Sequence, residues 1–274
     1  MYEEPYRWIE AVGNRRQYLD DQFQQGAPIV ALSYLEGILL VTFSRGTPKL
    51  YEIYDRIALG GMGHPADLEK LRFNLLDMAH VEGFNRSPSD VTGNRLMKYS
   101  LAPMIKQAFE EIFKAPFIAK ILLAEVGPQP DRDQFLTIDY DGSFEENRGC
   151  AVIAATSSIR KKMLAFLKTQ NNGPIDSLQT ALDLAVKTWA LGSLLHHSAE
   201  SLDHQDDEDQ QPAGAARSHE PDEKALVDHI RLALSEKSLE CALLDRTLPG
   251  SSKYRNLPPD QTRQLLPALL QPAV

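Results

Sequence analysis

The sequence lacks the features that mark secreted, membrane-spanning and zinc-dependent proteins. Its 274 residues include only two cysteines, Cys150 and Cys241, which are too few for a disulfide framework or a zinc site and are typical of a reducing compartment. It has no run of about 18 apolar residues that would span a membrane. The first residues do not combine a basic segment with an apolar core, so we expect no secretory signal and a cytoplasmic location.

An excess of one charge sign is confined to a single segment. The 29 basic and 38 acidic side chains give a formal net charge of −9, but residues 200–223 alone hold nine acids and one base. The rest of the chain is almost neutral, which suits packing against further copies of itself. It has no stripe of Lys and Arg with interleaved aromatic residues, so nucleic acid is not an expected partner.

Apolar periodicity predicts strands and helices that follow one another in blocks. Two hairpins are expected, at 29–43 around Glu36-Gly37 and at 49–60. The later expected strands cover 118–126, 135–139, 150–154, 238–245 and 253–257. The expected helices cover 3–25, 65–83, 91–113, 156–170, 175–194, 223–235 and 260–270. Such blocks indicate an α+β fold with antiparallel sheets flanked by helices, and a four-layer αββα sandwich satisfies the order.

The predicted organisation is one domain over residues 1–274. It begins with the N-terminal helix 3–25 and ends with a strand pair and a helix over 238–270. Residues 196–222 are polar, acidic and rich in Gln, Pro and Ala, which predicts a disordered insertion. Asp90 is expected to cap the helix that starts at residue 91.

Motifs for catalysis or cofactor binding are absent. The glycine cluster after the second hairpin, expected between a strand and a helix, has neither a Gly-Lys-Ser/Thr ending nor GxGxxG spacing, so it predicts a tight turn. There is no GxSxG elbow, and Cys150 is expected in the core. His196, His197, His204 and His219 fall in the acidic segment, where an adventitious zinc or nickel ion could bind but nothing predicts a fixed geometry. We therefore expect neither metal nor cofactor.

Several stretches, taken in order and with their spacing, resemble proteasome subunits. The resemblance covers about residues 3–195 and 236–270, and the αββα fold of that family agrees with the predicted blocks. The similarity to bacterial α subunits is strongest in Ala79-His-Val-Glu-Gly83, Asp90-Val-Thr-Gly93 and Tyr140-Asp-Gly-Ser143. The other similar stretches are Gly26-Ala-Pro-Ile-Val-Ala-Leu32, Glu36-Gly-Ile-Leu-Leu-Val41, Lys49-Leu-Tyr-Glu-Ile-Tyr-Asp-Arg-Ile57, Gly63-His-Pro-Ala-Asp67, Leu122-Leu-Ala-Glu-Val126, Ile138-Asp-Tyr-Asp-Gly-Ser143 and Ser238-Leu-Glu-Cys-Ala-Leu-Leu-Asp245.

The resemblance favours the non-catalytic of the two subunit types that share this fold. In β-type subunits, processing exposes a threonine whose own amine assists as the base. The matching position, just after Gly26, holds Ala27 and Pro28, which have no hydroxyl or thiol. The acidic residue that accompanies the catalytic lysine would fall near Phe43, which cannot serve. The resemblance therefore implies an α-type subunit without catalytic residues, which retains its N-terminal helix.

The resemblance also gives a role to Lys49, which on spacing alone is a surface lysine. In α subunits the matching lysine lies in a pocket between neighbouring subunits and pairs with the C-terminal carboxylate of an activator such as a ring ATPase. Gly26 and Gly63 match glycines that let the tail approach closely. The family further implies a heptameric ring stacked on β subunits, with Tyr6 and Trp8 on the helix that gates substrate entry.

Two other hypotheses remain open. The same fold would be an active Ntn-type peptidase or amidase if processing exposed a nucleophile such as Ser33 or Thr42. Alternatively, the chain is an orphan ring scaffold that binds another protein, with the acidic segment as its contact surface.

Overall fold

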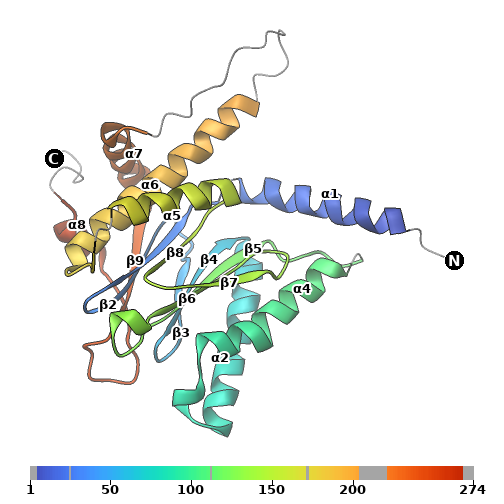
Figure 1. Ribbon diagram of the computed structural model, residues 1–274, viewed down its shortest axis with the longest axis horizontal. Coiled ribbons are helices and arrows are strands. Elements are labelled where there is room, and N and C mark those ends of the chain that lie inside the picture. Colours follow the sequence, from blue (N-terminus) through green and yellow to red (C-terminus); the bar gives the residue numbers. More distant parts are fainter. Residues whose placement is uncertain (1–4, 25, 112, 171–172, 204–220, 268–274) are drawn as a thin grey trace.

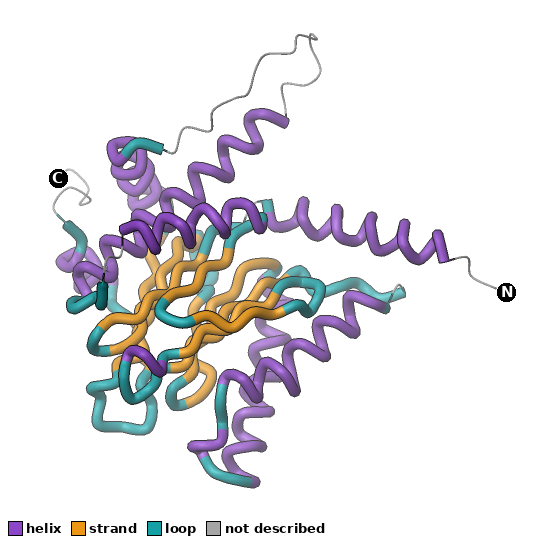
Figure 2. Tube along the Cα trace, viewed as in Figure 1, coloured by secondary structure: helices purple, strands orange, loops and turns teal. Residues whose placement is uncertain are grey.

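The protein consists of two five-stranded antiparallel sheets that pack face to face, with helices on both outer sides (Figure 1, Figure 2). The computed structural model describes residues 5–24, 26–111, 113–170, 173–203 and 221–267. This arrangement confirms the predicted α+β class and the αββα sandwich.

The first sheet contains the hairpin predicted around Glu36-Gly37, and its strand order is β10-β9-β2-β1-β8. Tyr34 lies opposite Gly37 in the β1–β2 pair, so the turn falls at Leu35 and Glu36, one residue earlier than predicted. The strands are β1 Ile29–Tyr34, β2 Gly37–Ser44, β8 Cys150–Ile153, β9 Ser238–Asp245 and β10 Tyr254–Asn256.

The second sheet has the order β3-β4-β5-β6-β7. Gly60 and Gly61 lie inside β4 and pair with β5, so the prediction that both belong to a strand-to-helix junction was wrong. A Cβ on Gly61 would come within 2.7 Å of Leu68, which shows how closely the next helix packs on the sheet. The strands are β3 Leu50–Tyr54, β4 Ile57–Gly63, β5 Ala119–Glu125, β6 Gln134–Ile138 and β7 Phe144–Asn147.

Two groups of helices cover the sandwich. One group, α5 to α8, packs on the first sheet, and the other, α2 to α4, packs on the second. No helix among the described residues is long and apolar enough to cross a bilayer. The helices are α1 Pro5–Phe23, α2 Pro65–Asn85, α3 Gly93–Leu96, α4 Ala102–Glu110, α5 Ser157–Gln170, α6 Leu178–Asp203, α7 Glu223–Glu236 and α8 Pro259–Leu265.

The central strands are apolar on both faces because both faces are covered. In β1, Val30 and Leu32 pack toward the outer helices, whereas Ile29 and Ala31 face the other sheet. Alternate side chains of a strand point to opposite faces, so a strand between two apolar layers needs apolar residues at every position. This accounts for the nearly continuous apolar run over 29–43.

Several features of the helices differ from the prediction. Thr92, not Asp90, caps the third helix by accepting a hydrogen bond from the Arg95 N–H at 3.4 Å. That helix is divided by a π-helical turn, Met97–Leu101, before it continues as α4. The most consequential difference is α6, which runs on to Asp203, so the prediction of disorder from residue 196 was wrong over 196–203. Most of the acidic insertion, 204–220, lies outside the described residues.

The C-terminal half of α1 is anchored to the sandwich, whereas its first turns extend beyond the sheets (Figure 1). Leu19 and Phe23 are fully buried against the inter-sheet core. The Arg15 guanidinium donates hydrogen bonds of 2.8 to 3.1 Å to four backbone carbonyl oxygens at and just beyond the C-terminal end of α4. These carbonyls belong to Ala108, Phe109, Glu111 and Lys114. Carbonyls at a helix end have no partner within the helix, so this contact fixes α1 to α4.

Candidate functional site

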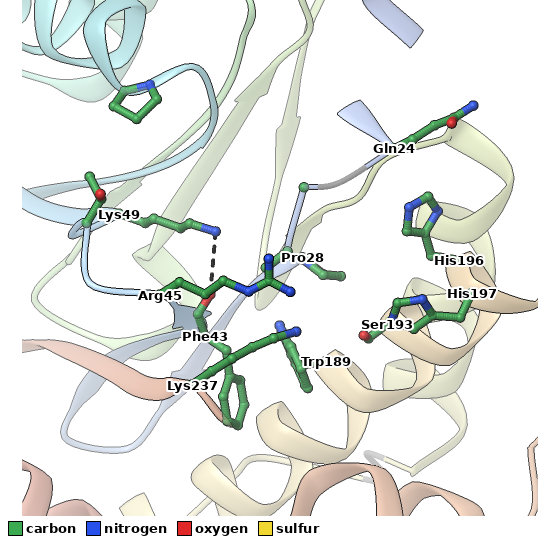
Figure 3. A pocket seen from close by; sticks show the side chains of 14 residues that line it. Gln24, Pro28, Phe43, Arg45, Lys49, Trp189, Ser193, His196, His197 and Lys237 are labelled. Atoms are coloured by element: carbon green, nitrogen blue, oxygen red, sulfur yellow. Dashed lines mark hydrogen bonds between the residues drawn. The ribbon is translucent and has the colours of Figure 1, made fainter. Parts of the chain in front are cut away.

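A polar cavity of about 540 Å³ opens at the end of the sandwich where β1 begins and β2 ends (Figure 3). Its walls come from segments far apart in the sequence, including the β2–β3 connection, the middle of α6 and the start of β9. No acidic side chain is among the described residues that line it, which are Gln24, Gly26, Ala27, Pro28, Phe43, Arg45, Thr47, Lys49, Pro65, Trp189, Ser193, His196, His197 and Lys237.

Three cationic side chains, those of Arg45, Lys49 and Lys237, extend toward this cavity (Figure 3). Within the described residues none of the three forms an ion pair with a carboxylate. Lys49 Nζ donates only to the Phe43 carbonyl, at 3.4 Å. The nearby Glu240 carboxylate accepts instead from the Lys49 backbone N–H at 2.9 Å. The cavity therefore carries an excess of positive charge.

The surroundings of Lys49 and Lys237 disfavour the charged forms of both side chains. Burial lowers the pKa of Lys49, repulsion from Lys237 and Arg45 adds to this, and attraction to Glu240 opposes it. Burial also lowers the pKa of Lys237, and Arg45 acts in the same direction. An anion bound in the cavity would reduce the repulsion between the cations and offset the cost of their burial.

Trp189 forms the apolar floor of the cavity. Its side chain is fully buried and packs on Phe43 with ring centroids 4.0 Å apart. Lys237 Nζ lies 5.8 Å from the centroid of the indole ring. The indole Nε1–H has no hydrogen-bond partner among the residues that the structure describes, although a buried donor without a partner costs about 1–3 kcal/mol.

The histidines around the cavity differ from their prediction. His196 and His197 lie in α6 and line the cavity, so the expectation of a solvated loop was wrong for both. His229 is half-buried on α7, stacks on Trp189 and bonds Ser193 Oγ through Nε2 at 2.9 Å. No cluster able to hold a metal ion occurs among the residues that the structure places. His204 and His219 lie outside the described residues.

The Ser193–His229 pair has the spacing of a nucleophile and a base but not the surroundings. Ser193 is only 6% exposed and lies within α6, whose backbone N–H groups are used by the helix. An acyl-transfer site needs free donors for the developing oxyanion. The pair is therefore a contact between α6 and α7.

Neither cysteine has the properties of a nucleophile. Burial raises the pKa of the half-buried Cys150 thiol and raises that of the fully buried Cys241 to about 12. A cysteine needs a lowered pKa to react as the thiolate at neutral pH.

The position where a β-type nucleophile would be expected lies in the same cavity. Ala27 and Pro28 line it together with Phe43 and Lys49. The structure thus brings together residues 27–28, Phe43 and Lys49, the three positions on which the distinction between α-type and β-type subunits was based.

Comparisons with known proteins identify the family of the chain. No family model matches the chain. It is 31% identical over 185 residues to the proteasome subunit alpha of Actinosynnema mirum, covering 66% of this chain and 67% of that one. It is 28% identical over 255 residues to that of Acidothermus cellulolyticus, with 92% of each chain covered, and 26% over 259 residues to that of Streptomyces griseus, with 94% and 82% covered. The chain belongs to the proteasome alpha-subunit family.

Of the two glycines expected at the docking pocket of an alpha subunit, one lines the cavity and the other lies at the end of a strand. Gly26 lines the cavity, and a Cβ there would meet the Met62 side chain at 2.7 Å. Gly63 is not among the lining residues. It ends β4 with φ +140°, and a Cβ on it would lie 2.0 Å from the Ile118 carbonyl oxygen, so its backbone geometry alone demands glycine.

The residues expected at the gate of an alpha subunit lie in the first turns of α1. Trp8 is 45% exposed, and Tyr6 belongs to the same helix.

Sequence reasoning missed Arg45, Trp189 and Lys237 as cavity residues. Arg45 and Lys237 carry no motif, and Trp189 occurs in an apolar helix pattern that predicts only core packing. A search for basic residues at the ends of the predicted strands would have found Arg45 and Lys237, which flank β2 and β9.

Proposed function

We propose that this alpha-family protein is a non-catalytic subunit of a proteasome core particle. It forms a heptameric outer ring, stacks on a ring of β subunits, gates substrate entry and docks the C-terminal tail of an activator. The single observation that carries the docking role is the cavity with three cations, whose described lining residues include no acid.

Lys49 is the docking charge in this proposal. Its ammonium group is half-buried, has no carboxylate partner among the described residues and can offer a compact point charge to a chain terminus. Gly26 lines the cavity in the same region, and the close approach of Met62 requires a glycine there. Gly63 contributes by shaping the end of β4, which precedes the cavity residue Pro65.

The non-catalytic role rests on the residues beside Lys49. An N-terminal nucleophile would need a hydroxyl or thiol at residue 27 or 28, and alanine and proline stand there. Phe43, at the place of the acidic partner, contributes only its carbonyl oxygen to Lys49.

The gating role rests on the shape of α1. Its first turns leave the sandwich and expose Trp8 by 45% and Ile9 by 66%. Exposed apolar side chains on a projecting helix favour contacts with neighbouring copies. A ring of such helices, including Tyr6, would narrow the central entrance.

The rival hypothesis of a processed hydrolase is less well supported. Ser33 lies within β1 and donates its hydroxyl hydrogen to Asp133, and the fully buried Thr42 donates to the Pro28 carbonyl at 2.8 Å. Exposing either as a new N-terminus would remove part of the central sheet. Intact mass tests this directly, because processing at Ser33 would remove about 3.5 kDa from the chain.

Assembly is tested by co-expression with a threonine-nucleophile β subunit, followed by native mass spectrometry and electron microscopy. We expect unprocessed chains in seven-membered rings on both ends of a β particle. A protein that stays monomeric with and without the β subunit overturns the proposal. Rings that bind another protein but never a β subunit would support the orphan scaffold instead.

Docking is tested on those particles with the Lys49→Met variant. We expect activator-stimulated peptide hydrolysis to fall at least about 10-fold, since a charge-assisted contact worth about 1.4 kcal/mol or more is lost. Basal hydrolysis by the β subunits should be unchanged. Lys224→Met, which removes an exposed charge on α7 outside the cavity, is the matched control and should behave as the wild type. Equal stimulation of the Lys49→Met and wild-type particles would contradict the docking role.

A further inference from the structure

One part of the cavity is not used by the docking of a chain terminus at Lys49. It consists of Trp189, Lys237 and Arg45, which come from α6, the start of β9 and the end of β2. Arg45 and Lys237 have no ion pair within the described part of the chain, and Lys237 Nζ lies 5.8 Å from the centroid of the Trp189 ring. Two strong cationic donors therefore remain after Lys49 has taken a carboxylate.

A second, independent observation points to a ligand at this place. The Nε1–H of Trp189 is buried and has no hydrogen-bond partner in the described ranges of the chain, on a side chain that is fully buried and lines the cavity. A buried donor that the protein leaves unsatisfied is suited to an acceptor supplied from outside. An indole N–H can only donate, so this acceptor must carry a lone pair, as a carboxylate oxygen does.

We propose that Trp189, Lys237 and Arg45 form a second anion subsite, which binds an Asp or Glu side chain of the same tail that gives its terminal carboxylate to Lys49. The proposal rests on the proposed docking function and narrows the partner to tails with an acidic residue close to the C-terminus. The carboxylate would accept hydrogen bonds from Nε1 of Trp189 and from Lys237, and Arg45 would cover it from the solvent side.

Apolar side chains lie beside the subsite and would partly exclude water from a bound carboxylate. The Phe43 ring packs against Trp189 at a tilt of 34°, and Ala27, Pro28 and Pro65 add to the apolar part of the lining. A carboxylate held against these groups is partly desolvated, and its hydrogen bonds are correspondingly strengthened. A tail with glutamine instead of glutamate would leave the two cations without a counter-charge.

Binding of labelled peptides to the full chain tests the subsite. The probes are fluorescein-labelled heptapeptides of Gly and Ser ending in Leu, with one Glu at each of the four positions before the last residue. Each is made with Glu or Gln, and with a free or an amidated C-terminus, and dissociation constants are measured by fluorescence anisotropy. For at least one position, we expect the Glu peptide to bind about 10-fold more tightly than its Gln counterpart.

Variants assign this preference to the subsite. In Lys237→Gln the Glu/Gln ratio should fall to about 1, and in Arg45→Gln and Trp189→Phe it should fall about threefold, while the free C-terminus remains preferred over the amide. Lys49→Met should show the reverse pattern, and Lys224→Gln should match the wild type. Lys237→Gln and Arg45→Gln change partly exposed residues, so they serve even if Trp189→Phe reduces folding.

The outcomes separate the subsite from the docking function. A Glu/Gln ratio near 1 at all four positions in the wild type overturns the subsite, as does a ratio that Lys237→Gln and Arg45→Gln leave unchanged. Either result leaves Lys49 docking intact. Equal binding of free and amidated peptides to the wild type overturns the docking function instead.

Discussion

The two ends of the sandwich treat buried charge in opposite ways. At the end where β1 finishes, Asp133 is fully buried and accepts hydrogen bonds from the Gly127 N–H and Arg246, both at 2.8 Å, and from Ser33. At the end where β1 begins, three cations line a cavity, and none of the described residues that line it is a carboxylate. Asp133 is paired within the described chain, whereas the three cations have no ion-paired carboxylate among the residues that the structure describes.

The comparison shows how a structural charge differs from a binding charge. Burial raises the pKa of Asp133, but three donors oppose that shift, and Arg246 is only 13% exposed at its side chain. The network joins the β1–β2 hairpin to the segments before β6 and after β9. We call the end that holds Asp133 the paired end and the end that holds the cavity the cationic end. At the cationic end, a ligand carboxylate would have to balance the positive charges, as Asp133 balances Arg246 at the paired end.

The largest effect is expected from breaking the paired end. Asp133→Ala removes the acceptor of three buried donors and leaves the Arg246 guanidinium uncompensated, so the free energy of unfolding should fall by about 3–5 kcal/mol. Urea denaturation followed by circular dichroism measures it. The exposed neighbour variant Asp131→Ala and the cationic-end variant Lys237→Gln should each stay within about 0.5 kcal/mol of the wild type. If Lys237→Gln destabilised as much as Asp133→Ala, the two ends would not differ.

A smaller effect is expected from Gly63, which tests whether a docking glycine at the cationic end acts through its backbone. Gly63→Ala should destabilise by about 1–3 kcal/mol, because its φ of +140° disfavours a side chain and the new Cβ would overlap the Ile118 carbonyl. Gly46→Ala is the matched control, since φ there is +112° and no atom lies within 4 Å of the new Cβ. Thermal unfolding of the two variants should show the larger loss for Gly63. Equal losses would mean that the overlap with Ile118 is relieved at no cost.

The smallest effect is a pH dependence from His229 behind the cationic end. Burial lowers the pKa of His229 below its ordinary value of 6.5, His197 and Lys237 act in the same direction, and Glu236 opposes them. The unfolded chain therefore binds the proton more readily than the folded one. The stability that depends on neutral His229 is complete above pH 6.5 and is lost as the pH falls through the folded-state pKa.

The variant His229→Gln should remove this part of the pH dependence. The measurement is the difference in the free energy of unfolding between pH 7.5 and pH 5.5, compared with the wild type. His80→Gln, which changes an exposed histidine on α2, is the control and should keep the wild-type slope. An unchanged slope in His229→Gln would show that the imidazole is as accessible to protons when folded as when unfolded.

Local sequence patterns were sufficient for most of the fold. The strand hairpins, the blocks of helices and the αββα layers follow from apolar periodicity and turn residues, which act over a few neighbouring positions. The errors occurred where tertiary contacts override local preference. β7 was missed because Phe144–Asn147 is short and largely exposed, and α6 runs past the predicted start of the acidic insertion, where His197 packs near His229.

The candidate site also has some features that the sequence reveals and others that only the tertiary structure reveals. The sequence by itself determined the absence of a hydroxyl or thiol at residues 27 and 28, the presence of Lys49 at the start of a strand, and the resemblance to proteasome α subunits. Only the tertiary structure decided that Lys49 shares a cavity with Arg45, Trp189 and Lys237. The physical reason is separation along the chain, because the residues come from three strand ends and a helix that only the closed sandwich brings together.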